Sequence, residues 1–185
     1  SIDVSGERTK ANYIVGTIAE DIFAYKKQEK ASKTFMDALK DNQWKVENCR
    51  LAGLPDLNQD NSWVREQLLS WVERIRDTYS IDGFRLDTGC EVSKDFWDEL
   101  TSRAGTYIVG EVFSGNVGYV ADYQNHLPGL LNYPMYFTIK NVFKDSNSMY
   151  EIKNRLSSDL PQFRDIDALG IFVDNHDNPR FLNND

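Results

Sequence analysis

From residue 54 onward, apolar side chains recur at two alternating spacings. The first run at helical spacing comprises Trp63, Val64, Leu68, Trp71, Val72 and Ile75. Asn61 or Ser62 suits the start of this helix, because a side-chain oxygen there accepts a hydrogen bond from the first turn. The pattern predicts further helices at about 93–104, 116–126 and 148–158.

Short apolar runs between these helices predict strands. The four runs are residues 83–87, 106–112, 129–137 and 169–174. Strands that alternate with helices of about 10–15 residues form right-handed βαβ units around a parallel sheet. Their short apolar centres are typical of strands that are covered on both faces. The sequence therefore predicts an α/β fold.

Residues 1–48 differ from the rest of the chain, since they hold most of the lysines and no proline. Two apolar stripes at helical spacing indicate a largely helical segment, to which no function is assigned; they are Ile14, Val15, Ile18 and Ile22, and then Phe35, Met36 and Leu39. The predicted organisation is this unassigned segment followed by one α/β domain at 49–185.

Charged side chains follow three of the predicted strands. They are Arg85 and Asp87 for the first strand, Glu111 for the second, and Asp174, His176 and Asp177 for the fourth. The carboxyl ends of parallel strands form the edge where ligands bind in α/β folds. One acid after a strand is usually a cap or a turn residue, but three strands with acids indicate an active site built on carboxylates.

Paired carboxylates suit the cleavage of an acetal. One carboxyl group must be protonated to serve the leaving oxygen, while the other stays ionised to attack the anomeric carbon. A third acid raises the pKa of the proton donor and holds substrate hydroxyls. Arg85 shares a strand face with Asp87 and would keep that carboxylate ionised. The residues predict glycoside chemistry, with a metal-bound carboxylate cluster as the alternative.

Several segments also have the order and spacing of known motifs. They are LPDL (54–57), YSIDGFRLDT (79–88), KDFWDEL (94–100), GEV (110–112), YQN (123–125), LNYPMYF (131–137), FVDNHD (172–177) and NHDNPRF (175–181). Through them the chain, from about residue 46 to 185, resembles the α-amylase family (glycoside hydrolase family thirteen), most of all fungal-type α-amylases. Each motif alone is moderately specific, whereas the ordered set is very specific.

This resemblance implies part of a (β/α)₈ TIM barrel, with strands corresponding to about the fourth through the seventh. It also implies retaining hydrolysis of α-1,4-glucosidic bonds in starch or glycogen. By position, Asp87 is then the nucleophile, Glu111 the general acid/base, and Asp177 the third acid that steadies the distorted sugar. Arg85 pairs with Asp87, and His176 donates to sugar hydroxyls.

A cofactor, partners and a location follow from the same resemblance. The acid of LPDL, here Asp56, contributes to a structural calcium site in the family, although calcium takes about six to eight oxygen ligands. The expected partners are α-glucans: starch, glycogen and maltooligosaccharides. The family implies secretion, while residues 1–13 lack the basic start and apolar core of a signal peptide.

Charge and composition narrow the partners further. The chain has 21 Lys and Arg against 29 Asp and Glu, a formal charge of −8, which argues against nucleic acid or an anionic membrane. No apolar run approaches the ~18 residues of a membrane span. Cys49 resembles a cysteine of the family, and a disulfide bond between Cys49 and Cys90 is one possible pairing.

Some features depart from the family pattern. A complete barrel takes about 250 residues, and neither the first three strands nor the eighth is recognised. The Asp and Asn-His of the family's third strand are missing, and Cys90-Glu91 replaces the usual Lys-His pair. The alternative function is therefore a truncated, inactive relative that binds glucan or a partner weakly. A transglycosylase of the same family is a third reading.

Overall fold

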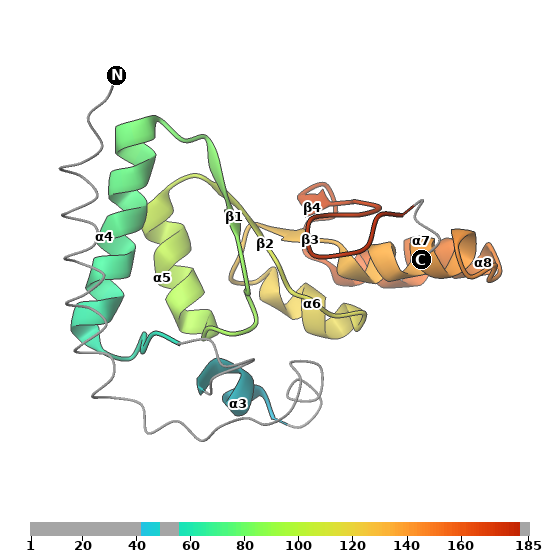
Figure 1. Ribbon diagram of the computed structural model, residues 1–185, viewed down its shortest axis with the longest axis horizontal. Coiled ribbons are helices and arrows are strands. Elements are labelled where there is room, and N and C mark those ends of the chain that lie inside the picture. Colours follow the sequence, from blue (N-terminus) through green and yellow to red (C-terminus); the bar gives the residue numbers. More distant parts are fainter. Residues whose placement is uncertain (1–41, 49–55, 182–185) are drawn as a thin grey trace. The chain divides into compact units, whose positions relative to one another are not determined.

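The computed structural model describes residues 42–48 and 56–181 (Figure 1). The chain divides into two compact units, one ending at Leu68 and the other beginning at Leu69. The predicted apolar stripes before residue 42 lie outside the described residues, as does Cys49. The described part of the first unit contains helix α3 (Gln43–Asn48) and the start of α4 (Ser62–Tyr79). Asn61 caps α4, because its Oδ1 accepts from the backbone N–H of Trp63 at 3.0 Å and of Val64 at 3.1 Å.

A four-stranded parallel sheet forms the centre of the second unit. Its strands lie in chain order: β1 (Gly83–Leu86), β2 (Tyr107–Gly110), β3 (Gly129–Leu131) and β4 (Leu169–Gly170). The register aligns Leu86 with Gly110, and Gly110 with Leu130. This sheet confirms the predicted α/β fold.

Helices connect each strand to the next, as Figure 1 shows. They are α5 (Lys94–Ala104) between β1 and β2, α6 (Val117–Tyr123) between β2 and β3, and α7 (Tyr133–Phe143) with α8 (Tyr150–Asn154) between β3 and β4. A π-helical turn (Arg155–Asp159) and a 3₁₀ turn (Leu160–Gln162) continue α8. Such repeated βα units are the building pattern of a TIM barrel. None of the described helices is long and apolar enough to cross a membrane.

The strand predicted at 129–137 is wrong in its second half. The strand ends at Leu131, and helix α7 begins at Tyr133. Asn132 caps this helix by accepting from the backbone N–H of Met135 at 3.0 Å, and Pro134 occupies its first turn. Proline lacks an N–H and is therefore well placed where no intrahelical partner exists. The last strand is also shorter than predicted, since only Leu169–Gly170 pair with the sheet.

The end of α5 is held by charged side chains from α4. Gly105 ends α5 with φ at 58°, in the left-handed region that glycine adopts without strain. Arg76 donates to the carbonyl oxygens of Arg103 and Ala104 at 2.9 and 2.8 Å. Arg103 in turn forms a double hydrogen bond with Glu73, at 2.6 and 2.8 Å. These contacts satisfy carbonyls left open at a helix end, and they hold the end of α5 against α4.

Candidate active site

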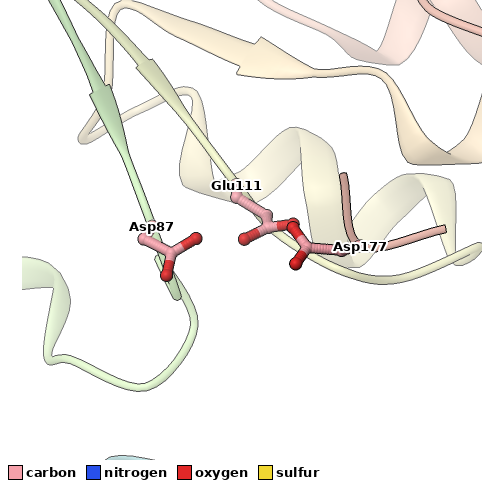
Figure 2. A group of neighbouring side chains, drawn as sticks. All are labelled: Asp87, Glu111 and Asp177. Carbon is pink, nitrogen blue, oxygen red and sulfur yellow. The ribbon is translucent and has the colours of Figure 1, made fainter. Parts of the chain in front are cut away.

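The predicted acids meet at the carboxyl edge of the sheet. Asp87 follows β1, Glu111 follows β2, and Asp177 comes from the loop after β4 (Figure 2). One carboxylate oxygen from each residue lies within 4.8 Å of those of the other two. Because parallel strands end at the same edge, residues far apart in the sequence come into contact there.

Backbone hydrogen bonds fix the two strand ends that carry Asp87 and Glu111. The N–H of Glu111 donates to the carbonyl of Leu86 at 2.8 Å, and the N–H of Gly89 donates to the carbonyl of Glu111 at 2.7 Å. The buried indole of Trp97 donates to the carbonyl of Gly89 at 2.7 Å. The loop after Asp87 is therefore hydrogen-bonded both to the residue after β2 and to α5. These bonds fix the backbone that carries the Asp87 side chain.

Gly89 leaves no room for a side chain. A Cβ at this position would lie 2.7 Å from the backbone oxygen of Glu111. We expect Gly89→Ala to lower the free energy of unfolding by about 1–3 kcal/mol, because backbone must move to relieve the overlap. Urea unfolding measures this loss.

Gly118→Ala is the matched control for Gly89→Ala. The nearest atom to a Cβ at Gly118 lies 3.7 Å away, so alanine fits there. Gly118 also lies within α6, where alanine favours the helix. Equal stability of the Gly89→Ala and Gly118→Ala chains would contradict the close approach of Gly89 to Glu111.

Arg85 joins the three acids. Its guanidinium lies 2.6 Å from Oδ1 of Asp87, 3.2 Å from Oε2 of Glu111 and 3.5 Å from Oδ2 of Asp177. The sequence pattern places Arg85 beside Asp87 only, whereas in the structure it contacts all three carboxylates. A fixed cation of this kind offsets the repulsion between acids that stand this close together.

The surroundings shift the pKa values of Asp87 and Glu111 in opposite directions. The pKa of Asp87 lies below its usual range, first because Asp87 hydrogen-bonds with Glu111 and then because of Arg85. The pKa of Glu111 lies above its usual range, chiefly because burial disfavours the charged carboxylate. The nearby Asp87 adds to this rise, while Tyr133 and Arg85 act against it. The surroundings thus favour the ionised form of Asp87 and the protonated form of Glu111.

The loop that carries His176 and Asp177 is fastened at its two ends. Asp174 accepts from the Arg180 guanidinium at 2.9 Å and from the backbone N–H of Phe181 at 3.0 Å. Asp174 therefore holds the loop, whereas Asp177 faces the other acids. His176 lies 3.1 Å from Oδ2 of Asp177 and its side chain is 67% exposed. The His176 ring is accessible to a ligand from solvent.

Sequence reasoning missed a residue at the centre of the site. The hydroxyl of Tyr133 donates to Oε1 of Glu111 at 2.7 Å, and Asn175 and Asn178 hydrogen-bond to the same hydroxyl. The strand predicted over 129–137 gave no sign that Tyr133 lies at the site. Asn132 and Pro134 form a helix-start signal in that run, and this signal could have shown that Tyr133 begins a helix beside the acids.

Metal-ligand geometry occurs at one place in the described part of the chain. The only group there of three or more His, Cys, Asp or Glu residues spaced for a metal is Asp87, Glu111 and Asp177. Arg85 already contacts all three carboxylates, which favours an ion-paired cluster over a metal-bound one. Asp56 belongs to no such group among the described residues. The role of Asp56 as a calcium ligand therefore stays a prediction.

Cys90 follows Asp87 by three residues, but its side chain is buried and not exposed at the site. Its thiol is buried, and burial raises its pKa to about 12. A thiol with such a pKa is not a nucleophile near neutral pH. Pairing with Cys49 stays a prediction, because Cys49 lies outside the described residues.

Comparison with known proteins identifies the family. The family model of the alpha amylase catalytic domain matches residues 7–184. The chain belongs to the α-amylase family. This α-amylase match confirms the resemblance drawn from the motifs, and it includes most of the segment at 1–48 that the sequence pattern left without a function.

Individual α-amylases are similar over about three quarters of the chain. A beta/alpha-amylase of Paenibacillus polymyxa is 45% identical over 142 residues, which are 77% of this chain and 12% of that protein. Alpha-amylase 2 of Schwanniomyces occidentalis is 39% identical over 145 residues, 76% of this chain and 29% of that protein. The chain thus spans less than a third of the length of either relative.

A solved α-amylase has the same fold. The structure of the Geobacillus thermoleovorans α-amylase, complexed with acarbose, matches with a TM-score of 0.74 and 31% identity. The match covers 83% of this chain and 35% of that one. The four parallel strands and their helices are therefore part of an α-amylase barrel, as predicted.

Proposed function

We propose that the chain carries the catalytic centre of a retaining glycoside hydrolase that cleaves α-1,4-glucosidic bonds in starch, glycogen and maltooligosaccharides. The observation that supports this most is the arrangement of Asp87 and Glu111 around Arg85, with their pKa values shifted apart. An ionised acid beside a protonated one is what acetal cleavage requires.

The spacing of the acids favours retention. Retaining glycosidases place their two carboxyl groups about 5–5.5 Å apart, whereas inverting ones leave about 6.5–9.5 Å for a water molecule. Oxygens of Asp87 and Glu111 lie within 4.8 Å of each other. This closeness favours the retaining arrangement, with Asp87 itself as the attacking group.

The reaction proceeds in two displacements. Asp87 attacks the anomeric carbon and forms a glycosyl ester, while Glu111 gives its proton to the departing glycosidic oxygen. Glu111, now ionised, takes a proton from water, and the water oxygen displaces Asp87 from the anomeric carbon. Two inversions at one carbon give net retention. If a sugar hydroxyl replaces the water, the same intermediate yields transglycosylation.

The remaining residues bind the sugar. Asp177 is half-exposed and accepts from sugar hydroxyls beside the reacting carbon, and His176 donates to them. Arg85 keeps Asp87 ionised and offsets the charge of the cluster.

Other expectations stay predictions. The calcium ligand role of Asp56 needs oxygen donors beyond those described, so no step is derived through calcium. Secretion, and the division into an unassigned segment at 1–48 and a partial barrel at 49–185, likewise rest on the sequence.

The opposed pKa shifts predict a bell-shaped pH profile. Activity needs Asp87 ionised and Glu111 protonated. Because the pKa of Asp87 is lowered, kcat/KM falls on the acid side only below the ordinary Asp value of about 3.9. Because the pKa of Glu111 is raised, the basic fall begins above the ordinary Glu value of about 4.3.

Initial rates on maltoheptaose between about pH 3 and pH 9 measure both limbs of this profile. The two apparent pKa values belong to the coupled pair of acids. A basic limb below about pH 4.3 would contradict the burial of Glu111.

Reducing-sugar release from soluble starch tests the proposed function. The chain is assayed with calcium present, and ¹H NMR follows the anomeric configuration of the first products. We expect release of α-anomers. The control chain carries both Asp87→Asn and Glu111→Gln, which keep the size of the two side chains and remove the chemistry. A folded chain that binds acarbose but releases no sugar would favour the inactive glucan-binding relative.

A further inference from the structure

We infer that Tyr133 is a positioning residue for Glu111: its hydroxyl, oriented by Asn175 and Asn178, holds Oε1 and leaves Oε2 as the oxygen that transfers the proton. This inference rests on the proposed function, because it assigns the chemistry within the same site. It adds to the acids a series of hydrogen bonds that runs from Asn175 and Asn178, in the loop after β4, through Tyr133 to Glu111.

The direction of each hydrogen bond follows from the loop. Oδ1 of Asn175 accepts from the backbone N–H groups of Asp177 and Asn178, both at 3.0 Å, and from Nδ2 of Asn178 at 2.7 Å. With its oxygen used in this way, Asn175 turns its NH₂ group toward Tyr133. That NH₂ donates to the Tyr133 hydroxyl oxygen at 3.1 Å, and the NH₂ of Asn178 lies 3.5 Å from the same oxygen.

The Tyr133 proton then has one destination. A phenol offers one donor and accepts at its oxygen. Both asparagine amides occupy the accepting side, so the hydroxyl hydrogen is left for Oε1 of Glu111, 2.7 Å away. Oε1 accepts this hydrogen bond whether Glu111 is protonated or ionised, so Tyr133 occupies a lone pair of Oε1 in both states. The mobile proton is assigned to Oε2, the oxygen that Tyr133 does not hold and that lies 3.2 Å from Arg85.

Aromatic packing makes the Tyr133 position rigid. Tyr133 is fully buried at the start of α7. Its ring makes edge contacts with Phe113 at 4.8 Å and with Phe172 at 5.0 Å between centroids. Phe113 follows Glu111 by two residues, and Phe172 precedes the loop of Asp177. The Tyr133 ring therefore contacts both the segment that carries Glu111 and the segment that leads to Asp177, and it helps to keep these two acids in place.

The Tyr133 hydrogen bond also moderates the acidity of Glu111. Burial raises the pKa of Glu111, and the phenol donor lowers it because it favours the ionised form. The titratable and charged groups that face Glu111 are Arg85, Asp87, Cys90, Tyr133 and Asp177. Tyr133 donates directly to a carboxylate oxygen of Glu111 and is itself neutral, its own pKa being raised to about 12 by burial and then by Glu111.

Tyr133→Phe tests the inference, since it keeps the ring and removes only the hydroxyl. We expect the pKa of Glu111, followed by ¹³C NMR of its carboxyl carbon and assigned with Glu111→Gln, to rise by about one unit. On maltoheptaose, the basic limb of the pH profile moves up equally. The value of kcat falls about tenfold while KM changes less than about twofold, because the acid is misplaced and not the substrate.

Tyr136→Phe is the matched control. Tyr136 lies in the same helix and the same aromatic cluster, stacked on Phe172, and its hydroxyl makes no hydrogen bond to Glu111 in the described structure. This variant should leave the pKa of Glu111 and the pH profile unchanged. A purely structural role of Tyr133 would lower the melting temperature without moving the pKa.

The outcomes separate the inference from the proposed function, because the NMR titration needs no turnover. A shifted Glu111 pKa in a chain that releases no sugar supports the Tyr133 contact and counts against the glycosidase. An unchanged Glu111 pKa in folded Tyr133→Phe overturns the inference, whatever the activity.

If Tyr133→Phe does not fold, the ¹³Cζ resonance of Tyr133 in the native chain decides. It should shift as Glu111 titrates, and a constant resonance overturns the inference.

Discussion

Replacing Asp87 by asparagine should lower kcat on maltoheptaose by more than about 10⁴-fold, the largest effect that we expect from any single change. The amide has the size of the carboxylate but carries no charge to attack the anomeric carbon. The amide oxygen can still accept from Arg85, whose guanidinium lies 2.6 Å from Oδ1 of Asp87, so the local contacts survive. Steady-state rates and the melting temperature together measure the change.

Asp98→Asn is the control for Asp87→Asn. Asp98 lies in α5 and pairs with His126 at 3.0 Å, outside the acid cluster. Its replacement should change kcat by less than about twofold. If Asp87→Asn kept a tenth of the activity while folded, Asp87 would not be the nucleophile and the double displacement would be wrong.

Replacing Glu111 by glutamine should lower kcat on starch by about 10²–10⁴-fold, because general acid–base catalysis contributes about that much. Glutamine has no proton to give to a sugar leaving group. An α-glucosyl fluoride needs none, since fluoride departs unaided. The first step should therefore proceed with this substrate, and the second should stall because no base activates water.

The stalled step leaves a distinct product. Intact-protein mass measurements on Glu111→Gln with the fluoride should show one added glucosyl group, attached to Asp87. Azide attacks without a base and should release it as the α-azide. Glu151→Gln, an acid-to-amide change in α8, should show neither effect. Equal losses on starch and on the fluoride would rule out Glu111 as the acid/base.

Some of the site was predictable from sequence because it depends on strand ends. Asp87 and Glu111 each follow a short apolar run, and in parallel sheets such positions converge. The prediction for the run 129–137 is wrong for a physical reason. A continuous apolar stretch fits a buried strand and a buried helix equally, so periodicity alone does not separate them. The cap at Asn132 and the proline at Pro134 decide for the helix, and both signals are local.

The amino-acid sequence by itself determined the α/β class and the family, and it predicted which acids lie together, because these follow from periodicity and from short motifs. Only the tertiary structure decided which atoms meet. Tyr133 reaches Glu111 across 22 residues of sequence, and Asn175 reaches Tyr133 across 42. The contact of Arg85 with three acids and the burial of Glu111 likewise arise when the strand ends come together. Desolvation and hydrogen-bond direction depend on what surrounds a group in space, and no pattern along the chain records those surroundings.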